Sequence, residues 1–166
     1  MKDKYILTAE SVTAGHPDKL CDTIADNVLD ACLKEDPNAR VACEVLATAG
    51  KILVAGELRT TASPDVEAIV RQTIRNAGYD CNYNVEVRLH TQSPDIAGAV
   101  DGDTLGAGDQ GIMYGYACWE TVELLPAPVV LANRITSLLT TCREEKLFSG
   151  IGPDGKAQVS VQYAFG

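Results

Sequence analysis

The chain has 166 residues, and its 14 Lys and Arg against 23 Asp and Glu give a formal net charge of −9. This balance excludes a protein that binds nucleic acid or anionic membranes through bulk charge, because such binding needs a surplus of Lys and Arg. Hydrophobic residues make up 46% of the chain and charged residues 22%, which is typical of a folded domain with a hydrophobic core.

The first element predicted along the chain is an amphipathic helix that begins at Pro17 and ends before Asp36. Two segments of period-two alternation follow, Arg40 to Thr48 and Lys51 to Leu58. The tight Ala49-Gly50 turn between them predicts an antiparallel hairpin. The apolar stripe of the helix consists of Leu20, Ile24, Val28 and Ala31 or Cys32.

The clearest helical pattern comes next, over residues 64–77. Ser63 is the expected N-cap, Pro64 fits the first turn, and Gly78 ends the helix. Apolar and charged residues then alternate over residues 85–89, which predicts a further strand.

A long stretch without pattern runs from about Thr91 to Gln110, and such loops are usually functional or disordered. Beyond it we expect a strand from Gly111 to Ala117, a helix from about Pro128 to Arg143, and a last strand over residues 158–163. The apolar stripe of that helix consists of Leu131, Ile135, Leu138, Leu139 and Cys142.

This order of elements indicates an α+β fold with mostly antiparallel sheets and helices packed on one face, and it disfavours a parallel doubly wound fold. The cysteines are scattered singly, so we interpret them as reduced thiols of a cytoplasmic protein. No export signal or membrane-spanning run is visible. The last strand pattern ends close to the final residue, and we expect that the chain stops partway through an architecture.

The first candidate site is residues 10–19 (ESVTAGHPDK), at the N-terminus of the first helix. That end of a helix favours anions, while His16 and Lys19 can donate to phosphate oxygens and Asp18 can hold a hard cation. The alternative is that His16 is an ordinary loop residue and Asp18 a first-turn carboxylate.

The hairpin holds a second candidate site. A turn at Gly50-Lys51 would place Glu44 directly opposite Glu57, and opposed carboxylates repel unless a cation or a substrate ammonium lies near them. Two solvated glutamates would also satisfy the pattern.

Two loops complete the set of candidates. Residues 106–111 (GAGDQG) contain three glycines that allow close backbone approach to a ligand, with Asp109 beside the next strand. Residues 153–156 (PDGK) are a strong turn signal before the last strand. Taken alone, each loop is interpreted as a plain turn, with Lys156 a solvated residue.

These segments together resemble the S-adenosylmethionine synthetase (methionine adenosyltransferase) family, which has three similar α+β domains. The resemblance rests on six collinear motifs: residues 10–19 (ESVTAGHPDK), 39–44 (ARVACE), 54–57 (VAGE), 92–97 (QSPDIA), 106–111 (GAGDQG) and 153–159 (PDGKAQV). It implies that residues 1–166 are the N-terminal portion of a longer chain, with parts of two interleaved domains. It also implies homo-oligomers or hetero-oligomers with a companion chain.

The resemblance further implies an enzyme that joins ATP and methionine, with release of phosphate and pyrophosphate and with Mg²⁺ and K⁺ as cofactors. His16 and Lys156 would contact the triphosphate and Asp154 the nucleoside, Asp18 would bind magnesium, and Glu44 would bind potassium. Glu57 and Gln92 would recognise methionine, and Asp109 would orient the substrates. The gate loop would begin with Gln92, Ser93, Pro94, Asp95 and Ile96 and extend to about Asp101.

Several positions depart from the family pattern. The family usually has Glu at Ala14, Lys at Thr91, and Thr-Asp or Thr-Asn at Cys118-Trp119, and its downstream basic motifs are absent from this chain. The alternative hypothesis is therefore a catalytically inactive binding or assembly module that retains the fold.

Overall fold

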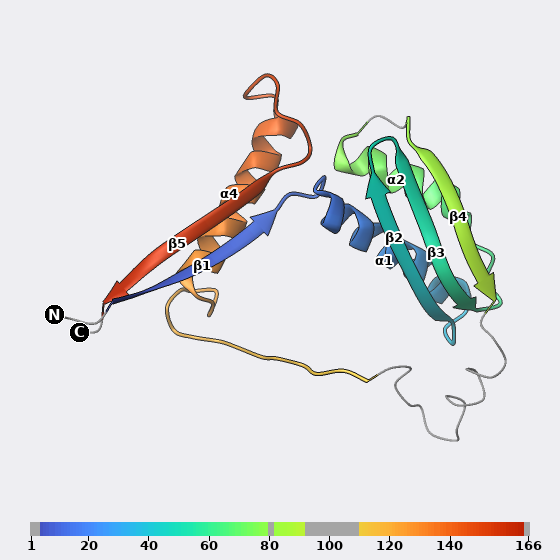
Figure 1. Ribbon diagram of the computed structural model, residues 1–166, viewed down its shortest axis with the longest axis horizontal. Helices are drawn as coiled ribbons and strands as arrows, with labels where there is room; N and C mark the ends of the chain where they lie inside the picture. Colours follow the sequence, from blue (N-terminus) through green and yellow to red (C-terminus); the bar gives the residue numbers. More distant parts are fainter. Residues whose placement is uncertain (1–3, 80–81, 92–109, 165–166) are drawn as a thin grey trace. The chain divides into compact units, whose positions relative to one another are not determined.

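The computed structural model describes residues 4–79, 82–91 and 110–164. The chain divides into two compact units, each built from segments distant in sequence (Figure 1). Unit 1 consists of Met1–Lys19, Ala77–Tyr79 and Gly115–Gly166, and unit 2 of Leu20–Asn76 and Asp80–Tyr114. No helix among the described residues is long and apolar enough to span a bilayer.

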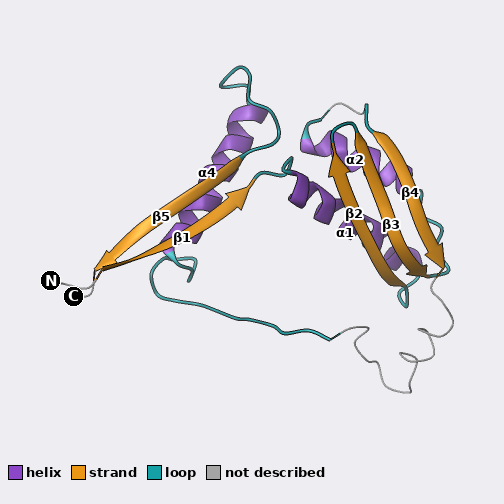
Figure 2. Cartoon of the chain, in the orientation of Figure 1, coloured by secondary structure: helices purple, strands orange, loops and turns teal. Residues whose placement is uncertain are grey.

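Unit 2 is a three-stranded sheet with helices on one face (Figure 2). Its strands are β2 (Arg40–Thr48), β3 (Lys51–Arg59) and β4 (Asn84–Thr91), in the order β2-β3-β4. The hairpin β2–β3 is antiparallel as predicted, whereas β4 runs parallel to β3, which makes the sheet mixed. The helices are α1 (Pro17–Glu35) and α2 (Val66–Ala77).

The hydrophobic core of unit 2 is formed by the apolar residues that recur with helical or strand spacing in the sequence. The predicted stripe of α1 is buried, from Leu20 to Cys32, and so are Ile52 and Val54 of β3. Both helices lie on the same face of the sheet (Figure 2). Asn27 donates from its amide to the Thr73 hydroxyl at 2.9 Å, which satisfies a polar pair between α1 and α2.

The predicted register of the hairpin is wrong by two residues. Thr48 pairs with Lys51, so the turn is Ala49-Gly50 alone, and Glu44 lies opposite Ala55 while Glu57 lies opposite Ala42. Because these positions share one sheet face, Glu44 and Glu57 are diagonal neighbours rather than an opposed pair. Gly56 has φ +138°, and a Cβ there would lie 2.0 Å from the Ala42 carbonyl oxygen, so the strand beside Glu57 requires glycine.

Unit 1 is a two-stranded ribbon covered on one face by α4 (Ala127–Glu144). Its strands, β1 (Lys4–Val12) and β5 (Lys156–Ala164), pair antiparallel along their full length. The sequence analysis did not predict β1. The hydroxyl of Ser11 contacts Asn133 Oδ1 and Thr136 Oγ1, each at 2.9 Å, and these bonds fix the ribbon on α4.

Two predictions in the second half are wrong. The helix packs through the small residues Ala132 and Thr136, because only small side chains let it approach the ribbon closely, and Leu131, Ile135 and Leu138 of the predicted stripe are exposed. The segment Gly111–Ala117 is not a strand, because it has no ladder partner among the described residues.

The start of α2 also differs from the prediction. Asp65, not Ser63, is the N-cap, since its carboxylate accepts a 3.0 Å hydrogen bond from the Ala68 amide, and Pro64 precedes the helix. The helix ends at Ala77, directly before Gly78, as predicted.

Replacing Asp65 by Ala should therefore lower the free energy of unfolding by about 1 kcal/mol, because the Ala68 amide loses its partner. Ser63→Ala should change the free energy of unfolding by only a few tenths of the loss in Asp65→Ala. Urea denaturation followed by circular dichroism measures both. Equal losses in the two variants would show that the cap is assigned to the wrong residue.

Candidate functional site

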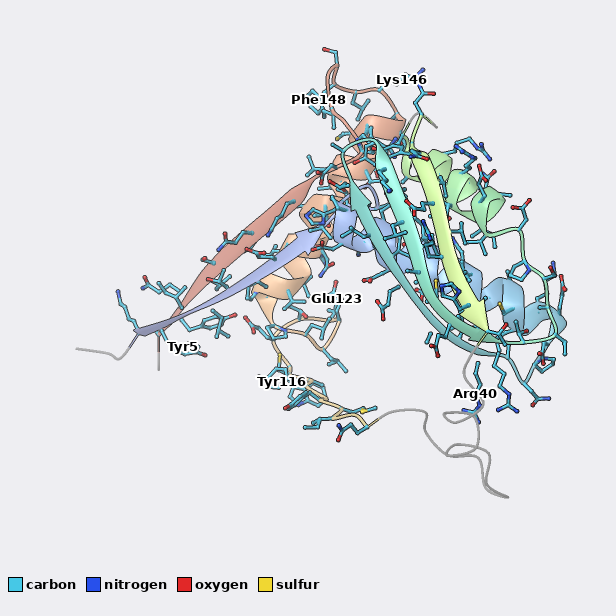
Figure 3. All side chains as sticks on the ribbon, turned by 45° about the vertical axis from the view of Figure 1, so that its right-hand side comes forward. Tyr5, Arg40, Tyr116, Glu123, Lys146 and Phe148 are labelled. Carbon is cyan, nitrogen blue, oxygen red and sulfur yellow. The ribbon has the colours of Figure 1, made fainter. Side chains whose placement is uncertain are left out.

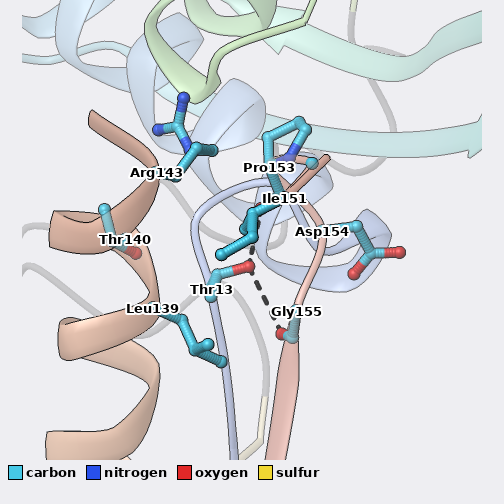
Figure 4. Close-up of a pocket in the computed structure, with 9 residues that line it drawn as sticks. Thr13, Leu139, Thr140, Arg143, Ile151, Pro153, Asp154 and Gly155 are labelled. Carbon is cyan, nitrogen blue, oxygen red and sulfur yellow. Dashed lines mark hydrogen bonds between the residues drawn. The ribbon is translucent and has the colours of Figure 1, made fainter. Parts of the chain in front are cut away.

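The candidate site in unit 1 lies where β1 ends and β5 begins. Thr13 binds the turn before β5, its amide donating to the Gly155 carbonyl at 2.9 Å and its hydroxyl to the Pro153 carbonyl at 2.7 Å. Figure 4 shows the hydroxyl bonds of Thr13 between the two segments. The loop before α1 and the turn before β5 are therefore held as one structure.

Gly15 is the point of closest approach in this loop. A Cβ at Gly15 would lie 2.4 Å from the Pro153 carbonyl oxygen, so no other residue fits there without displacing the turn. The Tyr79 hydroxyl donates to the Gly15 carbonyl at 2.7 Å from the other side. The backbone of His16, the next residue, is therefore held in place by these contacts of Gly15.

His16 stands at the N-terminus of α1. Its Nδ1 accepts a 3.3 Å hydrogen bond from the Asp18 amide and lies 3.8 Å from the Asp18 carboxylate. With Nδ1 as acceptor, the neutral ring carries its proton on Nε2, which is the nitrogen that can donate to a ligand. The Asp18 carboxylate itself is almost fully exposed.

Lys156 opens β5 and belongs to the same cluster. Its ammonium lies 2.6 Å from Glu10 Oε2, and the hydrogen bond and charge of Glu10, followed by the charge of Asp18, raise the pKa of Lys156. The side chain is half exposed, at 52%. The structure thus brings together His16, Asp18 and Lys156, which the sequence separates by about 140 residues.

A small cavity of about 70 Å³ lies next to this cluster, between α4 and the turn that contains Asp154 (Figure 4). It is well below the roughly 300 Å³ at which small-molecule pockets begin, so it cannot hold a nucleotide. The Asp154 carboxylate points away from Leu139 and Thr140, and the residue is exposed. A large ligand would therefore lie on the outer surface of the turn.

The second candidate pair, Glu44 and Glu57, lies on the sheet face of unit 2 that the helices leave open. Glu86 of β4 shares this face, and its ion pairs with Lys51 and Arg88 lower its pKa. Within residues 4–79, 82–91 and 110–164, no three His, Cys, Asp or Glu side chains form a ready metal cluster.

The remaining predicted site residues lie outside the described residues. These are Asp109 and the gate-loop residues Gln92, Ser93, Pro94, Asp95 and Ile96. The five described cysteines are free, in agreement with the predicted reduced state.

Sequence reasoning missed two residues that shape the site, Glu10 and Tyr79. Glu10 is in the first motif, but its pairing with Lys156 follows only once β1 is known to pair with β5. Tyr79 directly follows the glycine after α2 and carries no local sign of its bond to Gly15.

The cluster offers chemistry for a polyanion and a hard cation. The helix N-terminus, the His16 ring and the Lys156 ammonium are donors that suit phosphate oxygens. The exposed Asp18 carboxylate is the oxygen donor that suits Mg²⁺, which commonly binds through one or two carboxylates plus water and phosphate oxygens.

Two family models match the chain: residues 4–102 match "S-adenosylmethionine synthetase, N-terminal domain" and residues 104–166 match "S-adenosylmethionine synthetase, central domain". The chain is 48% identical to the S-adenosylmethionine synthase of a Nitratiruptor species, with 100% of this chain and 46% of the relative covered. It is 47% identical to that of Prochlorococcus marinus (strain NATL2A), with 98% and 44% covered. The chain thus spans less than half the length of these relatives.

Replacing Glu10 by Gln should lower the pKa of Lys156 toward the ordinary value of 10.5, because the partner that stabilises the ammonium is lost. A raised pKa stabilises the folded chain below pH 10.5, and this contribution disappears as the pH rises through the folded value. NMR titration of the lysine side chains measures the change. Glu86→Gln is the control, since it removes a carboxylate from Lys51 instead; an unchanged Lys156 titration in Glu10→Gln would contradict the assignment.

Proposed function

Because the chain belongs to the S-adenosylmethionine synthetase family, we propose that it carries part of an active site that forms S-adenosylmethionine from ATP and methionine. In that reaction the methionine sulfur attacks the ribose C5′ and expels the triphosphate, which is then hydrolysed to phosphate and pyrophosphate. No protein nucleophile is needed, and catalysis depends on alignment and charge stabilisation. The convergence of His16, Asp18 and Lys156 is the observation that supports this proposal best.

In this proposal the unit 1 cluster binds the leaving group. His16 donates from Nε2 and Lys156 from its ammonium to triphosphate oxygens, while Asp154 contacts the nucleoside. Asp18 would hold Mg²⁺, which supplies charge neutralisation of the phosphates when bound. Glu10 fixes the position of the Lys156 side chain across the open face of the ribbon.

Unit 2 would bind the other groups. Glu57 and Gln92 would recognise methionine, Glu44 would bind K⁺, Asp109 would orient the substrates, and the loop from Gln92 to about Asp101 would be the gate. The open sheet face that Glu44 and Glu57 share supports this part of the proposal, because a small cation or an ammonium can approach both carboxylates there.

We also propose that catalysis requires a companion polypeptide or a second copy. In the unit 1 cluster the Lys156 ammonium is already paired with Glu10, and Asp18 and Asp154 add negative charge, so a triphosphate needs further cations. The part of the relatives beyond the match would supply them. The competing function is an inactive binding or assembly module that retains the fold, and the two units would then be remnants of interleaved domains.

A turnover assay with ATP, methionine, Mg²⁺ and K⁺ distinguishes these functions. The chain alone should form no S-adenosylmethionine, and addition of the unmatched portion of the Nitratiruptor relative should restore its formation. Robust turnover by the chain alone would refute the need for a companion. A well-folded complex without turnover would favour the assembly module.

Lys156→Met should weaken binding of inorganic tripolyphosphate in the presence of Mg²⁺ by about three- to tenfold, because one charge-assisted hydrogen bond at a half-exposed site is lost. Isothermal titration calorimetry measures the affinity. Lys34→Met, at the far end of α1, removes the same charge elsewhere and is the control. Equal affinities in the two variants would show that Lys156 does not bind the phosphate groups.

Glu44→Gln should abolish any extra thermal stability that K⁺ confers over a bulky organic cation at the same ionic strength. Matched ionic strength separates specific binding from screening. Glu35→Gln, on α1, should leave the potassium response intact. Identical responses to potassium in the wild type and Glu44→Gln would show that Glu44 binds no potassium and is only a solvated strand residue.

A further inference from the structure

The short segment Ala77–Tyr79 at the end of α2 belongs to unit 1, and it contacts both α4 and the loop of the candidate site. Gly78 has φ +98°, a left-handed conformation that glycine adopts readily after a helix. The chain therefore leaves the helix at Gly78, and Tyr79 packs with unit 1.

Arg143, in the last turn of α4, fills the space beside Gly78. A Cβ at Gly78 would lie 2.2 Å from Arg143 Nη1 and 2.9 Å from Cζ, so the guanidinium occupies the place where any other residue would put its side chain. The Arg143 side chain is only 20% exposed, and its guanidinium donates to Glu144 at 3.2 Å. Because this group packs on a backbone turn, it acts on the conformation of the turn as well as through its charge.

The Arg143 side chain also lines the cavity of about 70 Å³ beside the candidate site (Figure 4). Thr13 and Pro153, which are joined by the 2.7 Å hydrogen bond of the Thr13 hydroxyl, line the same cavity. Arg143 therefore adjoins both the segment with Tyr79 and the turn at residues 151–155.

Tyr79 connects this region with His16. Its hydroxyl donates to the Gly15 carbonyl at 2.7 Å, and Gly15 is buried, so loss of the hydroxyl would take a partner from a carbonyl that water reaches poorly. His16 follows directly in the chain. Its ring orientation depends on the local backbone, because Nδ1 accepts a hydrogen bond from the Asp18 amide at 3.3 Å.

We propose that Arg143 and Tyr79 are positioning residues for His16. Arg143 holds Gly78 in place, and the Tyr79 hydroxyl then holds the Gly15 carbonyl, so that the His16 ring presents Nε2 to a ligand. Neither residue contacts the phosphate groups itself. The inference rests on the proposed function only in taking a triphosphate as that ligand, and the orientation of the ring can be measured without it.

The two histidines of the chain make the test direct, because His16 lies in unit 1 and His90, in unit 2, is an internal reference. In NMR spectra of the neutral rings, the nitrogen chemical shifts show which nitrogen carries the proton. Wild-type His16 should be fixed as the Nε2–H tautomer. Tyr79→Phe and Arg143→Met should each move the His16 signals toward those of a ring that exchanges freely between tautomers, with His90 unchanged.

Both variants should also weaken the binding of inorganic tripolyphosphate in the presence of Mg²⁺. The expected loss in isothermal titration calorimetry is about three- to tenfold, the range of one hydrogen bond. The double variant Tyr79→Phe with Arg143→Met should lose no more than the weaker-binding single variant, because both residues act through one path. Tyr79→Phe keeps the ring and its packing, so it tests the hydroxyl in a folded chain.

Two matched controls remove the same chemical groups elsewhere in unit 1. Arg134→Met takes a guanidinium from α4 where it donates to Glu123, and Tyr116→Phe takes a hydroxyl from a residue that is 74% exposed. Figure 3 labels Tyr116 and Glu123 in the segment that precedes α4. Both controls should leave the His16 signals unchanged and the affinity for tripolyphosphate within about a factor of two.

Unchanged His16 signals in Tyr79→Phe or in Arg143→Met would overturn the proposal, even if the affinity fell. Additive losses of affinity in the double variant would also overturn it, because they would show two independent effects. If the wild type bound no tripolyphosphate while the His16 signals moved as expected, the phosphate site of the proposed function would be refuted and the positioning of His16 supported.

Discussion

The contact of Thr13 with the turn at residues 153–155 is the interaction on which the candidate site depends. Its amide and hydroxyl satisfy the carbonyls of Gly155 and Pro153, and Gly15 leaves room for the turn to approach. The side chains of the site are brought into position only once this contact has formed. His16 and Lys156 each lie next to this contact, which joins two segments that are distant in sequence.

The pairing of β1 with β5 places this contact at the end of the ribbon. Nine consecutive residue pairs connect β1 with β5, from Lys4 with Ala164 to Val12 with Lys156. The ladder ends directly at the site, so the position of Lys156 is set by strand register rather than by its own contacts. Glu10 then fixes the side chain through a diagonal pair on the face away from α4.

Much of the fold could be predicted from local pattern. The burial of Leu20, Ile24, Val28 and Cys32 follows from helical spacing, and the hairpin follows from two alternating segments around Ala49-Gly50. Strand β1 could not be predicted in this way. Its residues 5–7 are three apolar residues in a row, Tyr5, Ile6 and Leu7, so the sequence does not alternate between apolar and polar residues. The face of α4 could not be predicted either, since close packing on the ribbon selects Ala132 and Thr136 over larger apolar residues. The site residues came from motifs, and their neighbours Glu10 and Tyr79 needed long-range pairing that no local signal carries.

The pairing of β1 with β5 also sets the order of events during synthesis. Strand β1 leaves the ribosome long before its partner emerges, and contacts of such sequence separation form slowly. Until then β1 exposes an unpaired edge, and the loop with His16 has nothing to close against. The hairpin of unit 2 needs only local contacts and can form earlier. The hairpin can therefore form at a stage of synthesis when β5, and with it the contact of Lys156 with Glu10, does not yet exist.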